Sequence, residues 1–91
     1  MSTIVIEREH RLGYAGAREQ AQHLAERLAQ KYKVSYHWDA DTLLLQRRGA
    51  QGSVQVDATR VYVKLKLGVL LAPLANIIKA EMEQALDQRL G

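Results

Sequence analysis

Three side chains near the middle of the sequence have the spacing of a metal or acid–base site. His37, Asp39 and Asp41 occupy every second position, so a continuous strand would place the imidazole and both carboxylates on one face. However, the segment Asp39-Ala40-Asp41 has the composition of a hairpin turn, which would break this alignment. We therefore interpret the segment as a turn and predict no metal site.

Three further titratable residues stand apart from any catalytic motif. His23 lies on the polar side of a predicted helix, and His10 lies at a strand-to-helix junction, where its imidazole could hydrogen-bond a backbone group. Glu81 interrupts an apolar stripe, so it is either a buried acid or a residue that reaches solvent or pairs with a lysine or arginine of the sheet. We favour structural or solvated roles for all three.

The sequence also lacks the usual nucleophile and phosphate-binding motifs. It has no cysteine, which excludes a disulfide, a thiolate zinc site and a cysteine nucleophile. None of Ser2, Ser35 and Ser53 stands in a glycine-flanked nucleophile elbow, and no phosphate-binding glycine loop is present. We predict no catalytic, cofactor-binding or metal-binding residues, and a protein that is not an enzyme.

Length and composition indicate a single domain over residues 1–91. Apolar residues make up 47% of the chain and the net charge is only +3, a combination that excludes intrinsic disorder. The longest uncharged run, Leu67 to Ile78, is much shorter than the roughly 20 residues of a transmembrane helix. The N-terminus lacks the features of a signal peptide, so we expect a soluble cytoplasmic protein.

Hydrophobic periodicity defines the elements that must position these side chains. Alternation predicts a strand over Thr3–Arg8, and an apolar stripe predicts a helix from Tyr14 to about Lys33. A second helix is expected to begin near Leu71, with Pro73 in its first turn. Four short strands are expected between the helices: Val34–Trp38, Thr42–Arg47, Ser53–Val56 and Arg60–Leu67. A loop at Gly49–Gly52 is expected to connect the second and third of these strands.

These elements predict an α+β fold with the order β-α-β-β-β-β-α. The short loops favour a mostly antiparallel sheet. The single apolar stripe of each helix places both helices on one face of that sheet, in a two-layer arrangement. The other face would be open to water or to a partner. The sequence permits a homodimer through this face or through the sheet edges without requiring one.

The excess positive charge belongs to the predicted sheet. Residues 31–66 contain seven lysines and arginines but only three aspartates, and Tyr62, Lys64 and Lys66 share the face opposite the core. The same face would also include Ser35, His37 and Gln55. A solvated face whose lysines prevent edge pairing is the favoured interpretation. Weak nucleic-acid binding through Tyr62, Lys64 and Lys66 is an alternative.

The segment from Leu67 to Ile78 is the most apolar part of the sequence. Its leucines and isoleucines either pack on the sheet or contact a lipid or polymer surface. The acidic residues of the second helix outnumber its basic ones, which argues against an anionic bilayer as that surface.

A family resemblance extends over nearly the whole chain. It rests on the segments TIVIEREHRLGYAGAR, AREQAQHLAERLAQKY continuing into VSYHWDADTLLLQRRG, VYVKLKLG and VLLAPLANIIKAEMEQAL. With these segments the sequence resembles the polyhydroxyalkanoic acid system proteins, a family of small bacterial proteins associated with polyhydroxyalkanoate granule gene regions. The resemblance implies a cytoplasmic accessory role in storage-polyester metabolism, without a known reaction or catalytic residues.

The leading hypothesis is a non-enzymatic, granule-associated protein that presents an apolar helix or sheet surface to the polyhydroxyalkanoate polymer or to a granule protein. The expected contacts are Leu70, Leu71, Leu74 and Ile78. The first alternative is a small acyl-ligand-binding domain, with a cavity between the C-terminal helix and the sheet that Tyr36 and Trp38 line. The second is the nucleic-acid binding described above. No cofactor is expected.

Overall fold

The computed structural model describes residues 2–90, and their secondary structure follows the predicted order. The elements are β1 (Ser2–Glu9), α1 (Gly13–Tyr32), β2 (Ser35–Asp39), β3 (Thr42–Arg47), β4 (Ala50–Val56), β5 (Arg60–Leu67), a short 3-10 helix η1 (Ala72–Leu74) and α2 (Ala75–Leu90). This arrangement confirms the predicted α+β class.

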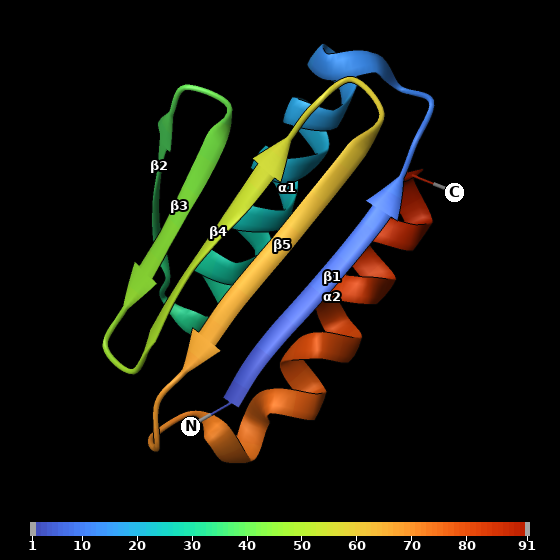
Figure 1. The fold of residues 1–91 in the computed structure, drawn as a ribbon. Coiled ribbons are helices and arrows are strands. Elements are labelled where there is room, and N and C mark those ends of the chain that lie inside the picture. The colour runs from blue at the N-terminus through green and yellow to red at the C-terminus, as the bar shows by residue number, and fades with distance from the viewer. Residues whose placement is uncertain (1, 91) are drawn as a thin grey trace.

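The five strands form one antiparallel sheet in the order β1-β5-β4-β3-β2. From β1 at one edge, α1 carries the chain behind the sheet to β2 at the opposite edge, and the meander β2-β3-β4-β5 then returns to β1 (Figure 1). Both helices cover the same face, as predicted, and the other face is open (Figure 1). The two helices run in opposite directions, and the β3–β4 turn and the β5–η1 connection lie at one end of the molecule, opposite the β4–β5 turn and the β1–α1 junction (Figure 1).

The hydrophobic core lies between the sheet and the helices. In β5 the alternation is complete, because Val61, Val63, Leu65 and Leu67 are buried while the residues between them face the open side. The buried stripe of α1 consists of Ala17, Ala21, Leu24, Ala25 and Leu28, as its periodicity predicted. Full burial of a leucine, valine or isoleucine side chain contributes about 1.5–3 kcal/mol, so these residues supply most of the driving force for folding.

The junction between β1 and α1 is fastened to the β4–β5 turn by His10. Its backbone N–H donates to Thr59 O at 2.9 Å, and its buried imidazole lies 3.2 Å from both the Leu12 N–H nitrogen and Asp57 O. Because the imidazole Nδ1 accepts a hydrogen bond from the Leu12 backbone N–H, Nε2 carries the ring proton and donates it to the backbone carbonyl oxygen of Asp57. Gly13 follows with a φ of 71°, which favours glycine. The predicted structural role of His10 is confirmed.

The fourth strand is longer than predicted. The segment assigned to a loop, Gly49–Gly52, is mostly strand, because β4 already begins at Ala50. Arg47 pairs with Ala50, which leaves a two-residue turn of Arg48 and Gly49, and Gly49 has a φ of 86°. Gly49 and Gly52 together suggested a loop, but only Gly49 lies in a turn, and Gly52 belongs to β4.

The second helix begins later than predicted. The chain first turns on Gly68, whose carbonyl accepts from the N–H groups of Leu71 and Ala72, and η1 then precedes α2. The tight turn and the missing N–H of Pro73 delay the start of the α-helix to Ala75. The buried face is therefore Ile78, Met82 and Leu86, whereas the neighbouring Ile77 is 59% exposed.

Candidate functional site

Four large apolar side chains are exposed together in sequence around the start of α2. Val69 is 81% exposed, Leu70 61%, Ile77 59% and Leu74 37%. They belong to the β5–η1 connection, to η1 and to the first turn of α2. We call these four residues the apolar tip. Apolar side chains that are exposed as a group, rather than singly, are typical of an interaction surface.

Backbone hydrogen bonds and a buried neighbour hold the tip in place. The Gly68 N–H donates to Gly49 O at 2.8 Å, which joins the tip to the β3–β4 turn. Leu70 lies above that turn, since a Cβ on Gly49 would be 3.4 Å from the Leu70 Cβ. Between the exposed residues, Leu71 is 7% exposed and packs into the core. The tip is thus an ordered feature of the fold.

The structure separates the four contact residues that the sequence suggested. Leu70 and Leu74 belong to the tip, whereas Leu71 and Ile78 are core residues, because the turn on Gly68 and the late helix start change the register. Val69 and Ile77 were not named as contacts. Val69 lies in the turn before η1, outside any helical stripe, and Ile77 lies on the exposed side of α2 because that helix begins at Ala75.

The basic residues of the open sheet face lie where the sequence placed them. Lys64 and Lys66 are exposed and Tyr62 is half-buried, and strand pairing sets Lys64 beside Val5 and Ser53. Ser35, His37 and Gln55 are exposed on the same face. No carboxylate within the described part of the chain lies close enough to Lys64 or Lys66 to form an ion pair.

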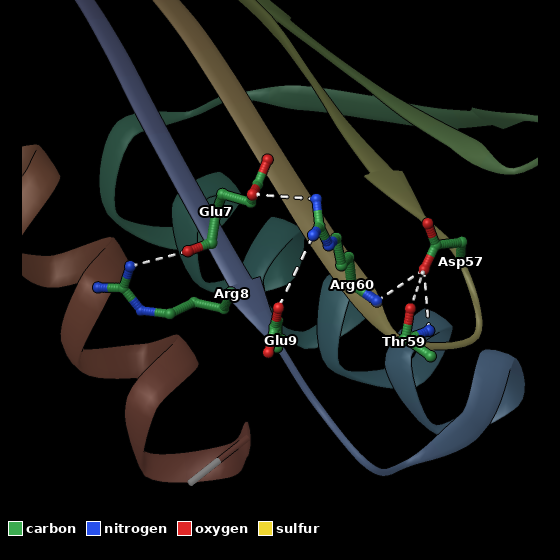
Figure 2. Close-up of polar contacts among 6 residues, drawn as sticks. All are labelled: Glu7, Arg8, Glu9, Asp57, Thr59 and Arg60. Carbon is green, nitrogen blue, oxygen red and sulfur yellow. Dashed lines mark hydrogen bonds and ion pairs between the residues drawn. The ribbon is translucent and has the colours of Figure 1, made fainter.

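The opposite end of the open face is acidic and internally paired. Figure 2 shows Arg60 of β5 between two carboxylates of β1, with Nη1 3.3 Å from Glu7 Oε1 and Nη2 3.7 Å from Glu9 Oε1. In the neighbouring turn, Asp57 Oδ1 accepts from the backbone N–H groups of Thr59 and Arg60 at 2.8 and 2.6 Å (Figure 2). These hydrogen bonds lower the pKa of Asp57.

The residues considered as a metal or acid–base site are placed in a hairpin, as the sequence suggested. His37 and Asp39 lie on β2 and Asp41 lies in the β2–β3 turn, where its Oδ1 accepts from Tyr14 Oη at 2.5 Å. Arg18 closes the same turn by donating to Ala40 O at 3.0 Å. In residues 2–90 no three histidine or acidic side chains form a group suited to a metal ion.

Tyr36 and Trp38 are not brought together with α2. Both lie on β2 and face α1, where Gln22 accepts from Trp38 Nε1 at 2.8 Å and donates to Tyr36 Oη at 3.4 Å. Arg18 stacks over the Trp38 ring at 3.8 Å. Since α2 packs against β1 and α1, it lies at the other edge of the sheet. A cavity beneath α2 would therefore not include these two aromatic rings.

Glu81 joins the two helices. Its Oε1 lies 2.6 Å from Lys31 Nζ and 3.5 Å from Arg27 Nε, and its Oε2 accepts from Tyr32 Oη at 3.0 Å. The Lys31 ammonium is the main cause of the lowered pKa of Glu81. The predicted pairing with a cation is correct, but its partners belong to α1 and not to the sheet. Burial raises the pKa of Tyr32, with the Glu81 hydrogen bond as a second cause.

Fold and surface together define a small α+β protein with two helices on one face of a five-stranded antiparallel sheet and an exposed apolar tip. Residues 4–90 match the family model described as "Putative polyhydroxyalkanoic acid system protein (PHA_gran_rgn)", and the chain belongs to this family. The match confirms the resemblance that the sequence segments suggested. No curated protein sequence matches the chain.

A solved structure shares the architecture. The chain is similar to the NMR structure of PA4090 from Pseudomonas aeruginosa, with a TM-score of 0.61 over 97% of this chain and 83% of that chain. The sequences are 7% identical, so the likeness concerns the fold alone. Within the described residues, no helix has both the length and the apolar character needed to cross a membrane.

Proposed function

We propose that this protein is a non-enzymatic accessory protein of polyhydroxyalkanoate storage that attaches to the granule surface through the apolar tip. The proposed place of action is the surface of storage granules in the bacterial cytoplasm. Membership of the polyhydroxyalkanoic acid system family supports the connection with storage metabolism. The observation that carries the mode of attachment is the exposure of Val69, Leu70, Leu74 and Ile77 at one end of the fold.

The tip has the properties that attachment to a weakly polar surface requires. Transfer of a complete valine, leucine or isoleucine side chain from water to an apolar environment contributes about 1.5–3 kcal/mol. Val69 and Leu70 are among the most exposed apolar side chains of the described residues and are not part of the core. The tip can therefore lose water contact at a surface while the rest of the protein remains unchanged.

Structural contacts of the titratable side chains support a non-enzymatic role. His10 fastens a turn, Asp57 accepts backbone hydrogen bonds within another turn, and Glu81 joins the two helices. His10 and Glu81, two of the groups considered for catalysis, are thus engaged in holding the fold. The proposed role is that of a docking or scaffolding protein.

Replacement of tip residues tests this role directly. The double variant Leu70→Ser/Ile77→Ser is expected to leave granules for the soluble fraction of polyester-accumulating cells, since it removes two of the most exposed apolar side chains. Part of the wild-type protein should stay on granules through a high-salt wash, because the apolar contacts of the tip are not screened by salt. Cell fractionation followed by immunoblotting measures the release of the variant and the retention of the wild type.

A matched control separates attachment from folding. Val5→Thr changes an apolar residue that is 48% exposed on the open sheet face, outside the tip, and should leave attachment unchanged. Thermal melts of the purified variants verify that they are folded. A folded Leu70→Ser/Ile77→Ser protein that remains on granules would overturn the proposed attachment.

A further inference from the structure

Positive charge gathers at the same end of the molecule as the apolar tip. The residue row Ser35–Gln46–Gln51–Lys66 crosses the sheet at this end through successive strand pairs. Four segments meet there, residues 2–5, 29–36, 44–53 and 64–80. They contain no aspartate or glutamate, and their basic residues are Lys31, Lys33, Arg47, Arg48, Lys64, Lys66 and Lys79.

Three of these cations lie next to residues that adjoin the tip. Arg48 precedes Gly49, the residue beneath Leu70. Arg47 and Lys66 line a hollow of about 330 Å³ together with Gly49 and Gly68. Within residues 2–90, no carboxylate forms an ion pair with Arg48, Lys66 or Lys79. The apolar tip thus has a rim of positive charge that the fold does not neutralise.

The acidic residues of α2 do not oppose this charge. Glu81 pairs with Lys31 and Arg27, while Glu83 and Asp87 bind Arg8 of β1 at 3.2 and 2.8 Å, toward the other end of the helix. The sequence argument against an anionic bilayer compared only the charges within the second helix, without their partners on other elements. Their pairing removes that argument.

We propose that the apolar tip and its basic rim bind an anionic phospholipid surface. This inference rests on the proposed function, because it names the component of the granule surface that the same tip would recognise. The aliphatic tip inserts among acyl chains, while Arg48 and Lys66 lie at the level of the phosphate groups. Charge complementarity selects lipid that is anionic. Nucleic acid is a poorer match, since the tip has no aromatic side chain on which bases could stack.

The test compares two kinds of vesicle, pure phosphatidylcholine and equal parts of phosphatidylcholine and phosphatidylglycerol. Co-sedimentation should show binding to the mixed vesicles that weakens with added salt, and at least tenfold weaker binding to phosphatidylcholine alone. The variant Arg48→Gln/Lys66→Gln should bind mixed vesicles about thirtyfold more weakly than the wild type. Arg11→Gln, which removes an exposed cation at the opposite end, should have no effect.

Three outcomes would overturn the inference. These are equal binding to both vesicle types, no binding to either, and tighter binding to a single-stranded oligonucleotide than to mixed vesicles. Tip-dependent attachment to lipid-free polyester particles distinguishes this failure from failure of the proposed function. If the wild type binds such particles but not anionic vesicles, the lipid inference is wrong and the granule role stands. If Leu70→Ser/Ile77→Ser does not change granule attachment, the proposed attachment through the tip fails.

Discussion

The charged form of Glu81 is favoured in the folded protein because the carboxylate binds Lys31, Arg27 and the Tyr32 hydroxyl. The pKa of this group therefore lies below its ordinary value of 4.5, with the Lys31 contact as the main cause. A lowered carboxyl pKa means that the stabilisation is complete above the ordinary value and is lost as the pH falls through the folded-state value. Contact between the helices is thus coupled to pH in the acidic range.

Glu81→Gln tests this coupling. Near neutral pH the variant should be less stable by about 1–3 kcal/mol, since Gln keeps the shape but loses the charge that binds both cations. The difference should shrink as the pH falls below the ordinary carboxyl pKa, because the wild-type protein then loses the same charge. Urea unfolding at a series of pH values measures it, with Glu19→Gln as a control at a side chain that is 71% exposed. A difference in unfolding free energy between the wild type and Glu81→Gln that stays constant down to acidic pH would contradict this role of Glu81.

At the scale of elements, β4 depends on a residue without a side chain. Gly52 pairs with Leu45 on one side and Leu65 on the other, in the interior of the sheet. A Cβ at this position would clash with the Lys64 carbonyl oxygen and lie 2.8 Å from Leu65 Cδ1. Glycine is therefore needed at this position because it lets β5 approach closely, and not because of its conformational freedom.

Gly52→Ala should destabilise the protein by about 1–3 kcal/mol, because the neighbouring strand must shift to make room for the methyl group. Urea unfolding followed by circular dichroism measures the loss. Ser53→Ala, at the next position on the open face, should change stability by less than about 0.5 kcal/mol. Equal effects of the two substitutions would show that packing at Gly52 is looser than described.

An element can be predicted from the sequence when the residues that determine it lie close together in the chain. The alternation of β5 and the stripe of α1 are contained in short windows, so the sequence predicts both correctly. The extension of β4 through Gly52 and the late start of α2 depend on contacts with β5 and on the turn at Gly68. Those contacts join distant or irregular segments, which periodicity cannot detect.

On the scale of the whole molecule, the two ends carry different chemistry. One end combines the apolar tip with unpaired cations, and the other contains Glu7, Glu9 and Asp57 in pairs and turns. The sequence indicated an excess of positive charge in the sheet and an apolar segment after it. Only the fold shows that the cations of three separate segments surround that segment, and that two of its expected contact residues are buried.

The most direct test of the central claim is a measurement of which surface loses water on the granule. Since the chain has no cysteine, Leu70→Cys and Val5→Cys each give a single site for a polarity-sensitive fluorophore, at the tip and on the open sheet face. Addition of isolated polyhydroxyalkanoate granules should shift the emission of the Leu70→Cys conjugate to the blue and leave the Val5→Cys conjugate unchanged. A blue shift at Val5→Cys without one at Leu70→Cys would contradict attachment through the tip.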